Sequence, residues 1–432
     1  MSKFSADLLV RQGRLIDPAN GTDVIGDILI RQGKIVESAP SLSTPPDVPV
    51  LTATGLVVAP GFIDIHTHLR EPGYEHKETI QSGTAAAAGG GICAVAAMPN
   101  TNPPPDSSDH LQLALERAQA ASVRYYPIAC VTVGRQGRGA LAPLAELAEL
   151  GAVAFSDDGD PVEDEALMRR ALEIARDLDR PIFPHEEVKS LTADGCMHAG
   201  EVAARLGVKG MPAAGEEEMV ARDIELVRQT GGPLHIAHIS TAGTAQLVRR
   251  AKADGLPVTC EVLPHHFVLT DREVERQGTA AKMSPPLREA ADVEAMLAGL
   301  ADGTIEVIAT DHAPHTAAEK AQSLTQAPMG IVGLETAVGL TLTYLVDRVL
   351  PLHEAIARWT CHPARILRLP GGALSPGMPG DLTLLDLTRE WEVVPAHFRS
   401  KSRNTPFAGY HLKGKAVATI VGGQIVYSEL AA

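Results

Sequence analysis

Short apolar segments alternate with helical patterns through the middle of this 432-residue chain, and this alternation constrains the fold more than any other feature. Eight segments are candidate strands: residues 56–66, 91–98, 123–131, 153–156, 181–185, 233–238, 257–262 and 304–310. Repeated units of strand and helix are typical of α/β proteins with a parallel sheet. Eight such units predict a closed (β/α)8 barrel, the TIM barrel.

One of the intervening helices carries clear signals at its start. Asp160 is a candidate N-cap, Pro161 suits the first helical position, and Glu163 stands three residues after the cap. Apolar residues then recur at helical spacing up to Leu178. The pattern predicts a helix that begins at Pro161.

The two ends of the chain resemble each other. Residues 7–17, 27–37 and 418–428 each carry strand-like residues around a tight glycine turn, which predicts three hairpins. A small hairpin sheet is marginally stable alone. We therefore expect residues 1–55 and 371–432 to build one small β domain together, beside a barrel formed by residues 56–370.

The composition excludes several classes of protein. A formal net charge of −15 argues against binding to nucleic acid or to an anionic membrane, because a phosphate-binding surface needs a basic excess. The five cysteines show neither a disulfide framework nor the CxxC spacing of a zinc site. The N-terminal residues lack the apolar run of a signal peptide, and no apolar stretch reaches membrane-spanning length. These features predict a cytoplasmic protein.

Side chains that can bind metal stand at the C-terminal ends of the strand candidates. His66 and His68 form an HxH pair at the end of the first one, and residues i and i+2 of a strand point to the same side. The ends of other candidates carry Asp157, Asp158, His185, His238 and Asp311. Because all strand C-termini of a parallel barrel open on one face, we expect these side chains to converge there.

The donor types indicate which metal the site would hold. Imidazole and carboxylate without thiolate suit Zn²⁺ and also Mn²⁺ or Co²⁺, and of these we expect zinc. Six protein ligands exceed the three that one catalytic zinc ordinarily takes, so two ions are expected. A carboxylate shared between them would hold the pair at the short separation that two-metal hydrolases use.

Seven motifs follow one another along the chain: GFIDIHTHLREPG, AAMPNTNP, FSDDG, HISTAGT, KMSPPLR, ATDHAPH and GIVGLET. Together they resemble the bacterial class I dihydroorotases of the amidohydrolase superfamily, and the resemblance spans nearly the whole chain. It implies a hydrolase of cyclic amides that interconverts N-carbamoyl-L-aspartate and L-dihydroorotate in the biosynthesis of pyrimidines (UMP).

The resemblance implies six metal ligands, namely three for a first ion, two for a second and one bridge: His66, His68 and Asp311; His185 and His238; and Asp158. Hydantoinases, dihydropyrimidinases, allantoinases and other dihydroorotases use a carbamylated lysine as the bridge, and FSDDG contains no lysine. Asp157 is the adjacent alternative, which spacing alone does not exclude. Asp311 is also the expected catalytic residue, which takes the proton of the attacking water and delivers it to the departing nitrogen.

The resemblance also implies the substrate-binding residues: His68, Leu69, Arg70, Asn100, Ser284, His315, Met329 and Gly330. Arg70 resembles a carboxylate clamp, since a guanidinium binds a carboxylate in planar, bidentate geometry. Three features depart from the family pattern. Ser284 replaces the usual Asn, so one substrate hydrogen bond is expected to be shortened, replaced by water or lost; Met329 replaces a frequent Phe; and PHEE replaces the commoner histidine-cysteine surroundings of His185. The polar residues 316–328 are expected to form a mobile flap over this site.

Two other functions stay open at this point. A cyclic-amide hydrolase of the hydantoinase or allantoinase type would share the barrel and the metals but accept uncharged rings. Arg70, Asn100 and the absent lysine speak against it. A catalytically silent dihydroorotase-like partner of aspartate carbamoyltransferase would have lost metal ligands, and none is missing here. Active relatives also associate with that transferase, so the family implies this contact and a homodimer besides the small-molecule substrate.

Overall fold

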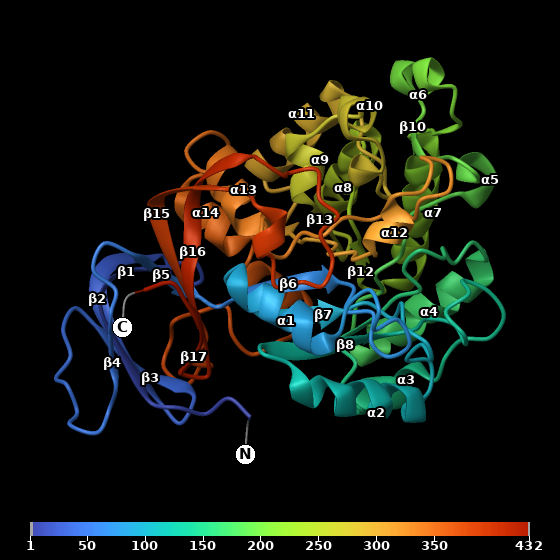
Figure 1. Ribbon diagram of the computed structural model, residues 1–432. Coiled ribbons are helices and arrows are strands. Elements are labelled where there is room, and N and C mark those ends of the chain that lie inside the picture. The colour runs from blue at the N-terminus through green and yellow to red at the C-terminus, as the bar shows by residue number, and fades with distance from the viewer. Residues whose placement is uncertain (1–2, 431–432) are drawn as a thin grey trace.

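The computed structural model describes residues 3–430 and contains a closed parallel barrel (Figure 1). Its strands are β6 (Phe62–Thr67), β7 (Ile92–Ala97), β8 (Arg124–Ala129), β9 (Ala154–Phe155), β12 (Leu234–Ile236), β13 (Val258–Val262) and β14 (Val307–Ile308). The candidate over residues 181–185 supplies the eighth position through Ile182, which bridges to Phe155 on one side and Leu234 on the other. A parallel bridge between Thr67 and His312 closes the ring. The predicted TIM barrel is confirmed.

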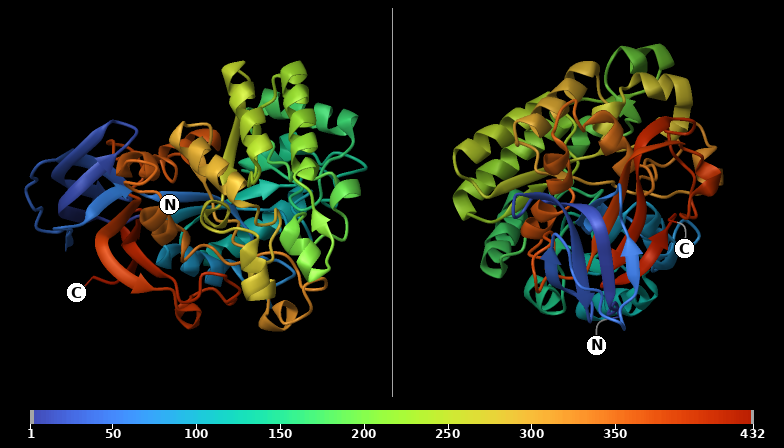
Figure 2. Two further views of the ribbon diagram at one scale, coloured as in Figure 1. Left: turned by 90° about the horizontal axis from the view of Figure 1, so that it is seen from above. Right: turned by 90° about the vertical axis from the view of Figure 1, so that its left-hand side faces the viewer.

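Helices cover the outside of the barrel, so its strands are buried on both faces (Figure 2). Every residue of β6 and β7 is buried, which explains their nearly continuous apolar sequences. The longer helices are α1 (Ile80–Gly89), α2 (Ser108–Arg117), α4 (Glu165–Leu178), α7 (Ala214–Thr230), α8 (Ala242–Ala253), α11 (Ala290–Ala301) and α13 (Ala337–Tyr344). The shorter ones are α3 (Leu144–Glu149), α5 (Lys189–Thr192), α6 (Glu201–Leu206), α9 (Pro264–Val268), α10 (Arg272–Gln277), α12 (Ala317–Lys320), α14 (Leu352–Ala357) and α15 (Cys361–Ile366). Strands β10 (Met197–His198) and β11 (Gly210–Met211) pair with each other in a separate two-stranded sheet. Across residues 3–430, no helix is both long enough and apolar enough to cross a membrane.

The two ends of the chain build one sheet beside the barrel, as the sequence predicts (Figures 1 and 2). Its strands are β1 (Leu8–Asp17), β2 (Thr22–Arg31), β3 (Lys34–Ala39), β4 (Val50–Thr52), β5 (Val57–Pro60), β15 (Leu382–Glu392), β16 (His411–Val421) and β17 (Gln424–Ser428). N-terminal and C-terminal strands meet where β5 pairs antiparallel with β15, with Val58 opposite Leu384. Residues 1–2 and 431–432, at the outer limits of the two predicted end segments, lie outside the described residues.

The first predicted strand, residues 56–66, consists of two strands that meet at Gly61. A Cβ atom at Gly61 would come within 2.7 Å of Asp381 and 2.8 Å of Cys93, so the backbone passes too close to its neighbours for any side chain. Strand β5, before this glycine, pairs with β1 in the end sheet. The chain therefore leaves the end sheet after Pro60 and not after residue 55. The sequence does not mark this boundary, because no turn residue interrupts the apolar run between the two positions.

Two of the three predicted hairpins are confirmed, and the third is wrong. Strands β2 and β3 form one hairpin, and β16 and β17 form the other. Residues 7–17 instead form the single strand β1, which carries a β-bulge between Val10 and Gly13. The Asp27 carboxylate accepts hydrogen bonds from the Gln12 backbone at 2.8 Å and from the Arg11 side chain at 3.3 Å. The first of these bonds satisfies a backbone N–H group that the bulge removes from the ladder.

Helix α4 begins four residues later than the sequence predicts. It starts at Glu165, and its N-cap is Asp164, whose side chain accepts a hydrogen bond from the Leu167 backbone. The predicted cap, Asp160, forms an ion pair with Arg135 at 2.8 Å instead. Residues 161–164 are not helical, and the carbonyls of Val162 and Glu163 accept hydrogen bonds from the Arg222 side chain.

Candidate active site

The predicted metal-binding side chains converge at the C-terminal face of the barrel. They lie at or just after the C-terminal ends of β6, β9, the Ile182 bridge, β12 and β14, and all of them are buried: His66, His68, Asp158, His185, His238 and Asp311. His238 and Asp311 have left-handed backbones, with φ of 34° and 44°. Such conformations cost free energy and persist where the surrounding structure holds them, as active sites often do.

Asp158 lies between two pairs of histidines. Its Oδ1 atom is 3.5 Å from both His185 Nδ1 and His238 Nε2 and 3.8 Å from His66 Nε2. Its Oδ2 atom is 3.5 Å from His68 Nε2. Two ligand atoms bound tetrahedrally at ~2.1 Å from one zinc ion would be about 3.4 Å apart. The spacing therefore fits two adjoining ion sites that share Asp158.

Asp311 lies on the side of the first histidine pair. Its Oδ1 atom is 2.8 Å from His68 Nε2 and 3.6 Å from His66 Nε2. The pKa of Asp311 falls to about 2 although burial alone would raise it, because the neighbouring histidines favour the carboxylate. The side chain is therefore an ionised acceptor at neutral pH.

Asp157, the alternative to Asp158, is committed to the loop after β8. Its carboxylate accepts hydrogen bonds from the backbone of Val131 at 2.8 Å and of Gly137 at 3.0 Å, and also from Thr132. These bonds use both oxygens of Asp157. The geometry favours Asp158 as the carboxylate shared by the histidine pairs.

Negative charge surrounds His66 in this cluster. Burial would lower the pKa of His66, but Glu261, Asp311 and Asp158 together raise it to about 10. The His66 Nε2 atom is buried and has no hydrogen-bond partner among the described residues. On the other side of Asp158, His185 Nδ1 and His238 Nε2 are only 3.2 Å apart. Converging ring nitrogens among buried carboxylates form a donor set that suits a divalent metal of the zinc type.

Glu261, on β13, is a site residue that the sequence analysis missed. It is fully buried, and its Oε1 atom accepts hydrogen bonds from His66 Nδ1 at 2.5 Å and from the His238 backbone at 3.2 Å. Its Oε2 atom faces His235 Nε2 at 3.3 Å. The signal was a lone carboxylate inside the apolar segment TCEVL. Glu187 was missed as well; its Oε2 atom lies 3.1 Å from His185 Nε2.

A cavity of about 390 Å³ opens above this cluster. Of the expected substrate-binding residues, seven line it: His68, Arg70, Asn100, Ser284, His315, Met329 and Gly330. Leu69 does not, because its side chain packs in the core against Gly83 of α1. The cavity is also lined by Lys189 and Gly195, which the sequence analysis did not single out.

Arg70 and Asn100 offer unused polar atoms at this cavity. Arg70 Nε and Asn100 Oδ1 are buried atoms without a hydrogen-bond partner among the described residues. Asn100 Nδ2 donates to the Asp158 carbonyl at 2.8 Å, which fixes the amide beside the cluster. Withdrawal from solvent lowers the pKa of Arg70, and the nearby Asp311 counteracts this effect. The guanidinium is a cationic group available to an anionic substrate here, whereas Lys189 is paired with Glu187.

The opposite wall of the cavity is internally bonded. His315 Nε2 donates to the Met329 carbonyl at 2.8 Å, and Lys77 Nζ donates to His315 Nδ1 at 3.3 Å. Burial, followed by the charges of Arg70 and Lys77, lowers the pKa of His315 to about 3, so the ring is neutral. The neighbouring segment 316–328 contains the short helix α12, which a capping box of Thr316 and Glu319 stabilises.

The chain is similar to proteins of one family along its full length. Residues 55–244 match a family model described as dihydro-orotase-like. A dihydroorotase of Citrifermentans bemidjiense is 48% identical over 422 residues, which cover 98% of this chain and 99% of the relative. A dihydroorotase of Pelotomaculum thermopropionicum is 50% identical over 423 residues, with the same shares of 98% and 99%.

Solved structures with the same fold carry other names. An L-hydantoinase (dihydropyrimidinase) from Arthrobacter aurescens matches 99% of this chain and 97% of its own with a TM-score of 0.89 at 24% identity. A D-hydantoinase from Thermus sp. matches 98% of this chain and 95% of its own with a TM-score of 0.86 at 25% identity. This likeness supports the shared architecture of barrel and end sheet.

Proposed function

The chain belongs to the dihydroorotase family, and from this premise we propose that it catalyses the reversible cyclisation of N-carbamoyl-L-aspartate to L-dihydroorotate in the biosynthesis of pyrimidines. The protein is a hydrolase of cyclic amides. The reaction joins a carbamoyl nitrogen to a carboxyl carbon in one direction and breaks that amide with water in the other.

One observation carries the choice of substrate: Arg70 faces the cavity beside the metal-ligand cluster with its Nε atom unpaired. Both dihydroorotate and carbamoyl-aspartate carry a carboxylate that remains unchanged in the reaction. A guanidinium recognises such a group through charge-assisted, bidentate hydrogen bonds. The hydantoinase or allantoinase alternative has no comparable support, since an uncharged ring would leave Arg70 without a partner.

The metal centre is part of this proposal. We assign His66, His68 and Asp311 to one ion, His185 and His238 to a second, and Asp158 to both. Zinc suits these donors, and when bound it would polarise the amide carbonyl and lower the pKa of a water molecule.

The side chains then divide the remaining work. Arg70 and Asn100 bind the carboxylate and orient the ring, with Ser284 and the backbone of Met329 and Gly330 against its other edges. Asp311 accepts the proton of the attacking water and delivers it to the nitrogen that departs from the carbonyl carbon. In the direction of ring closure, Asp311 takes the proton from the carbamoyl nitrogen as this nitrogen attacks the carboxyl carbon, and returns the proton to the hydroxide that departs as water.

The test is turnover of L-dihydroorotate and carbamoyl-aspartate by the purified protein, with hydantoin and dihydrouracil as competing substrates and metal content measured on the same sample. We expect bound metal and a strong preference for dihydroorotate. Metal-loaded protein that prefers hydantoin would overturn the proposal, and protein without metal or activity would favour the silent partner of aspartate carbamoyltransferase.

Partners and compartment rest on the family resemblance alone. We propose a homodimer in the cytoplasm that also contacts aspartate carbamoyltransferase. Light scattering after size exclusion, with and without the transferase, tests both contacts. A monomer that elutes unchanged in its presence would contradict them.

A further inference from the structure

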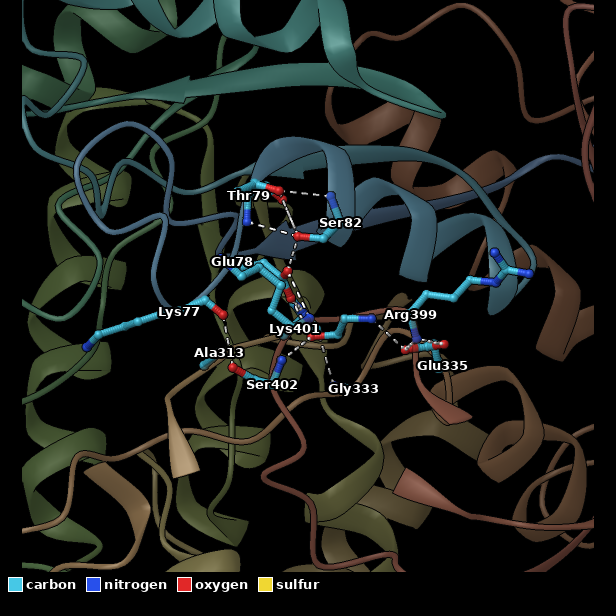
Figure 3. A network of polar contacts seen from close by, with 12 residues as sticks. Lys77, Glu78, Thr79, Ser82, Ala313, Gly333, Glu335, Arg399, Lys401 and Ser402 are labelled. Atoms are coloured by element: carbon cyan, nitrogen blue, oxygen red, sulfur yellow. Dashed lines mark hydrogen bonds and ion pairs between the residues drawn. The ribbon is translucent and has the colours of Figure 1, made fainter. Parts of the chain in front are cut away.

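A segment from the C-terminal part of the chain crosses the catalytic side of the barrel. Residues 399–404, here called the strap, follow β15 and lie against α1 and the loops after β14 (Figure 3). Glu335 holds the beginning of the strap, because its carboxylate accepts hydrogen bonds from the backbone of Arg399 at 2.8 Å and of Ser400 at 3.2 Å. Ser402 holds the middle, since its hydroxyl donates to the Lys77 carbonyl at 3.0 Å.

Glu78 joins the strap to the end of the last barrel strand. This fully buried carboxylate accepts hydrogen bonds from the Lys401 backbone at 3.2 Å and from the hydroxyls of Ser82 and Ser400 (Figure 3). It also faces His312 Nε2 at 3.3 Å. His312 directly follows Asp311, so the strap is bonded to the strand end that carries the proposed proton carrier.

Asn404, at the end of the strap, reaches the wall of the cavity. Its Nδ2 atom donates to the carbonyls of Gly330 at 3.1 Å and Ala313 at 3.3 Å. Its Oδ1 atom accepts a hydrogen bond from the His315 backbone at 3.3 Å. One amide thus ties together two segments that line the cavity, and it does so from behind, because Asn404 is not among the lining residues.

Gly330 can take only a narrow range of positions. Its φ of +130° is a conformation that side chains rarely adopt, and a Cβ atom would come within 2.7 Å of Ala313 and 3.2 Å of His315 Nε2. Its carbonyl also accepts a hydrogen bond from Lys320 Nζ at 3.0 Å. Asn404 and Lys320 therefore fix the peptide plane of Gly330 from two sides.

We propose that Asn404 is a positioning residue for substrate binding: by bonding to Ala313, His315 and Gly330 together, it holds in place the wall of the cavity that the His315 ring and the Met329–Gly330 backbone form. This inference rests on the proposed function, because that wall is assigned to the ring of dihydroorotate. Asn404 touches neither substrate nor metal ligands. Its loss should therefore weaken binding more than it slows the chemical step.

The test compares Asn404→Ala with Ser402→Ala, a control on the same strap whose hydroxyl bonds to Lys77 and not to the wall. Loss of one or two hydrogen bonds should raise the KM for dihydroorotate about five- to tenfold in Asn404→Ala, with kcat within about twofold of wild type. Metal content should be unchanged. Ser402→Ala should keep the wild-type KM even if its Tm falls.

A second variant keeps the test decisive if Asn404→Ala folds poorly. Asn404→Asp retains the acceptor for His315 but replaces the donor to Gly330 and Ala313, so it should raise KM as well. Wild-type KM values in both variants, with only Tm lowered, would overturn the positioning role. If the wild-type protein itself fails to turn over dihydroorotate, the proposed function fails instead, and the two failures are distinguishable.

Discussion

The His66 ring can present only one nitrogen to the metal cluster, because Glu261 takes the other. The hydrogen bond from His66 Nδ1 to Glu261 leaves Nε2 as the nitrogen that faces Asp158 and Asp311 and that would bind a metal ion in place of a proton. The same carboxylate holds the strained backbone of His238, a ligand assigned to the other ion. A single buried residue therefore orients ligands of both proposed sites.

Glu261→Gln should lower metal affinity about 10- to 100-fold, since the amide cannot keep both the charge and the two acceptor oxygens. Competition with a chelator for bound zinc measures this. Glu216→Gln is the control, because Glu216 is equally buried but bonds to Ser240 and Arg288. That variant should lose stability and keep metal affinity, and an equal loss of affinity in both would show that Glu261 acts through the fold only.

Asp311→Asn should reduce kcat about 10²- to 10⁴-fold, because an amide of the same shape cannot accept the proton. The low pKa of Asp311, about 2, means that the wild-type base stays ionised through the whole neutral range. Steady-state turnover of dihydroorotate, with metal content measured alongside, checks this. A metal-loaded Asn variant with near wild-type kcat would remove Asp311 from the proposed chemistry.

The residues of the site differ in how far the sequence could predict them. The candidate ligands follow strands, and the barrel turns positions far apart in sequence into neighbours at one face. Glu261 and Asn404 do not share that signal, since one lies inside an apolar strand segment and the other reaches the wall from the C-terminal segment. Their roles depend on hydrogen bonds that only the folded chain forms.

The helices and strands also differ in how far the sequence could predict them. The barrel and the shared end sheet follow from periodicity and from glycine turns, which are local properties. The bulge in β1 and the late start of α4 do not follow from local properties, because they involve contacts with Asp27 and Arg135, which lie elsewhere in the chain. Glycine permits both a turn and a bulge, and a distant carboxylate selects between them.

The strap is bonded to a carboxyl group that titrates near neutral pH, that of Glu335. Burial raises the pKa of this carboxyl to about 7 from its ordinary value of 4.5. Between these values the folded protein holds a proton that the unfolded chain has released. The stability contributed by Glu335 is therefore complete below about pH 4.5 and is lost as the pH rises through 7.

Glu335→Gln removes this titration, so the free energy of unfolding of wild type minus that of the variant should fall by about 2 kcal/mol between pH 5 and pH 8. Urea unfolding of both proteins at the two pH values measures the difference. A difference that stays constant would mean that Glu335 does not change its protonation on folding in this range.

At the scale of the whole molecule, the barrel and the end sheet are joined by a bidentate ion pair. Arg124, at the start of β8, donates to Asp381 just before β15 through Nε at 2.5 Å and Nη2 at 2.8 Å. Asp381 also accepts a hydrogen bond from the Gly422 backbone at 2.7 Å. The pair lies at the N-terminal ends of the barrel strands, away from the cavity, where TIM barrels concentrate stability and not catalysis.

Arg124→Met should lower the free energy of unfolding by about 2–4 kcal/mol, because it leaves Asp381 charged and largely buried without its partner. Turnover of dihydroorotate should remain at the wild-type level, since the change lies at the opposite end of the barrel from Asp158. Arg14→Met is the matched control: its pair with Asp23 is 45% and 48% exposed, against 19% and 13% for Arg124 and Asp381. Exposed pairs contribute at most about 1 kcal/mol. Equal losses of unfolding free energy in the two variants would mean that the end sheet is held on the barrel by apolar contacts alone. A loss of turnover in Arg124→Met would mean that the position of the end sheet affects the active site through the strap.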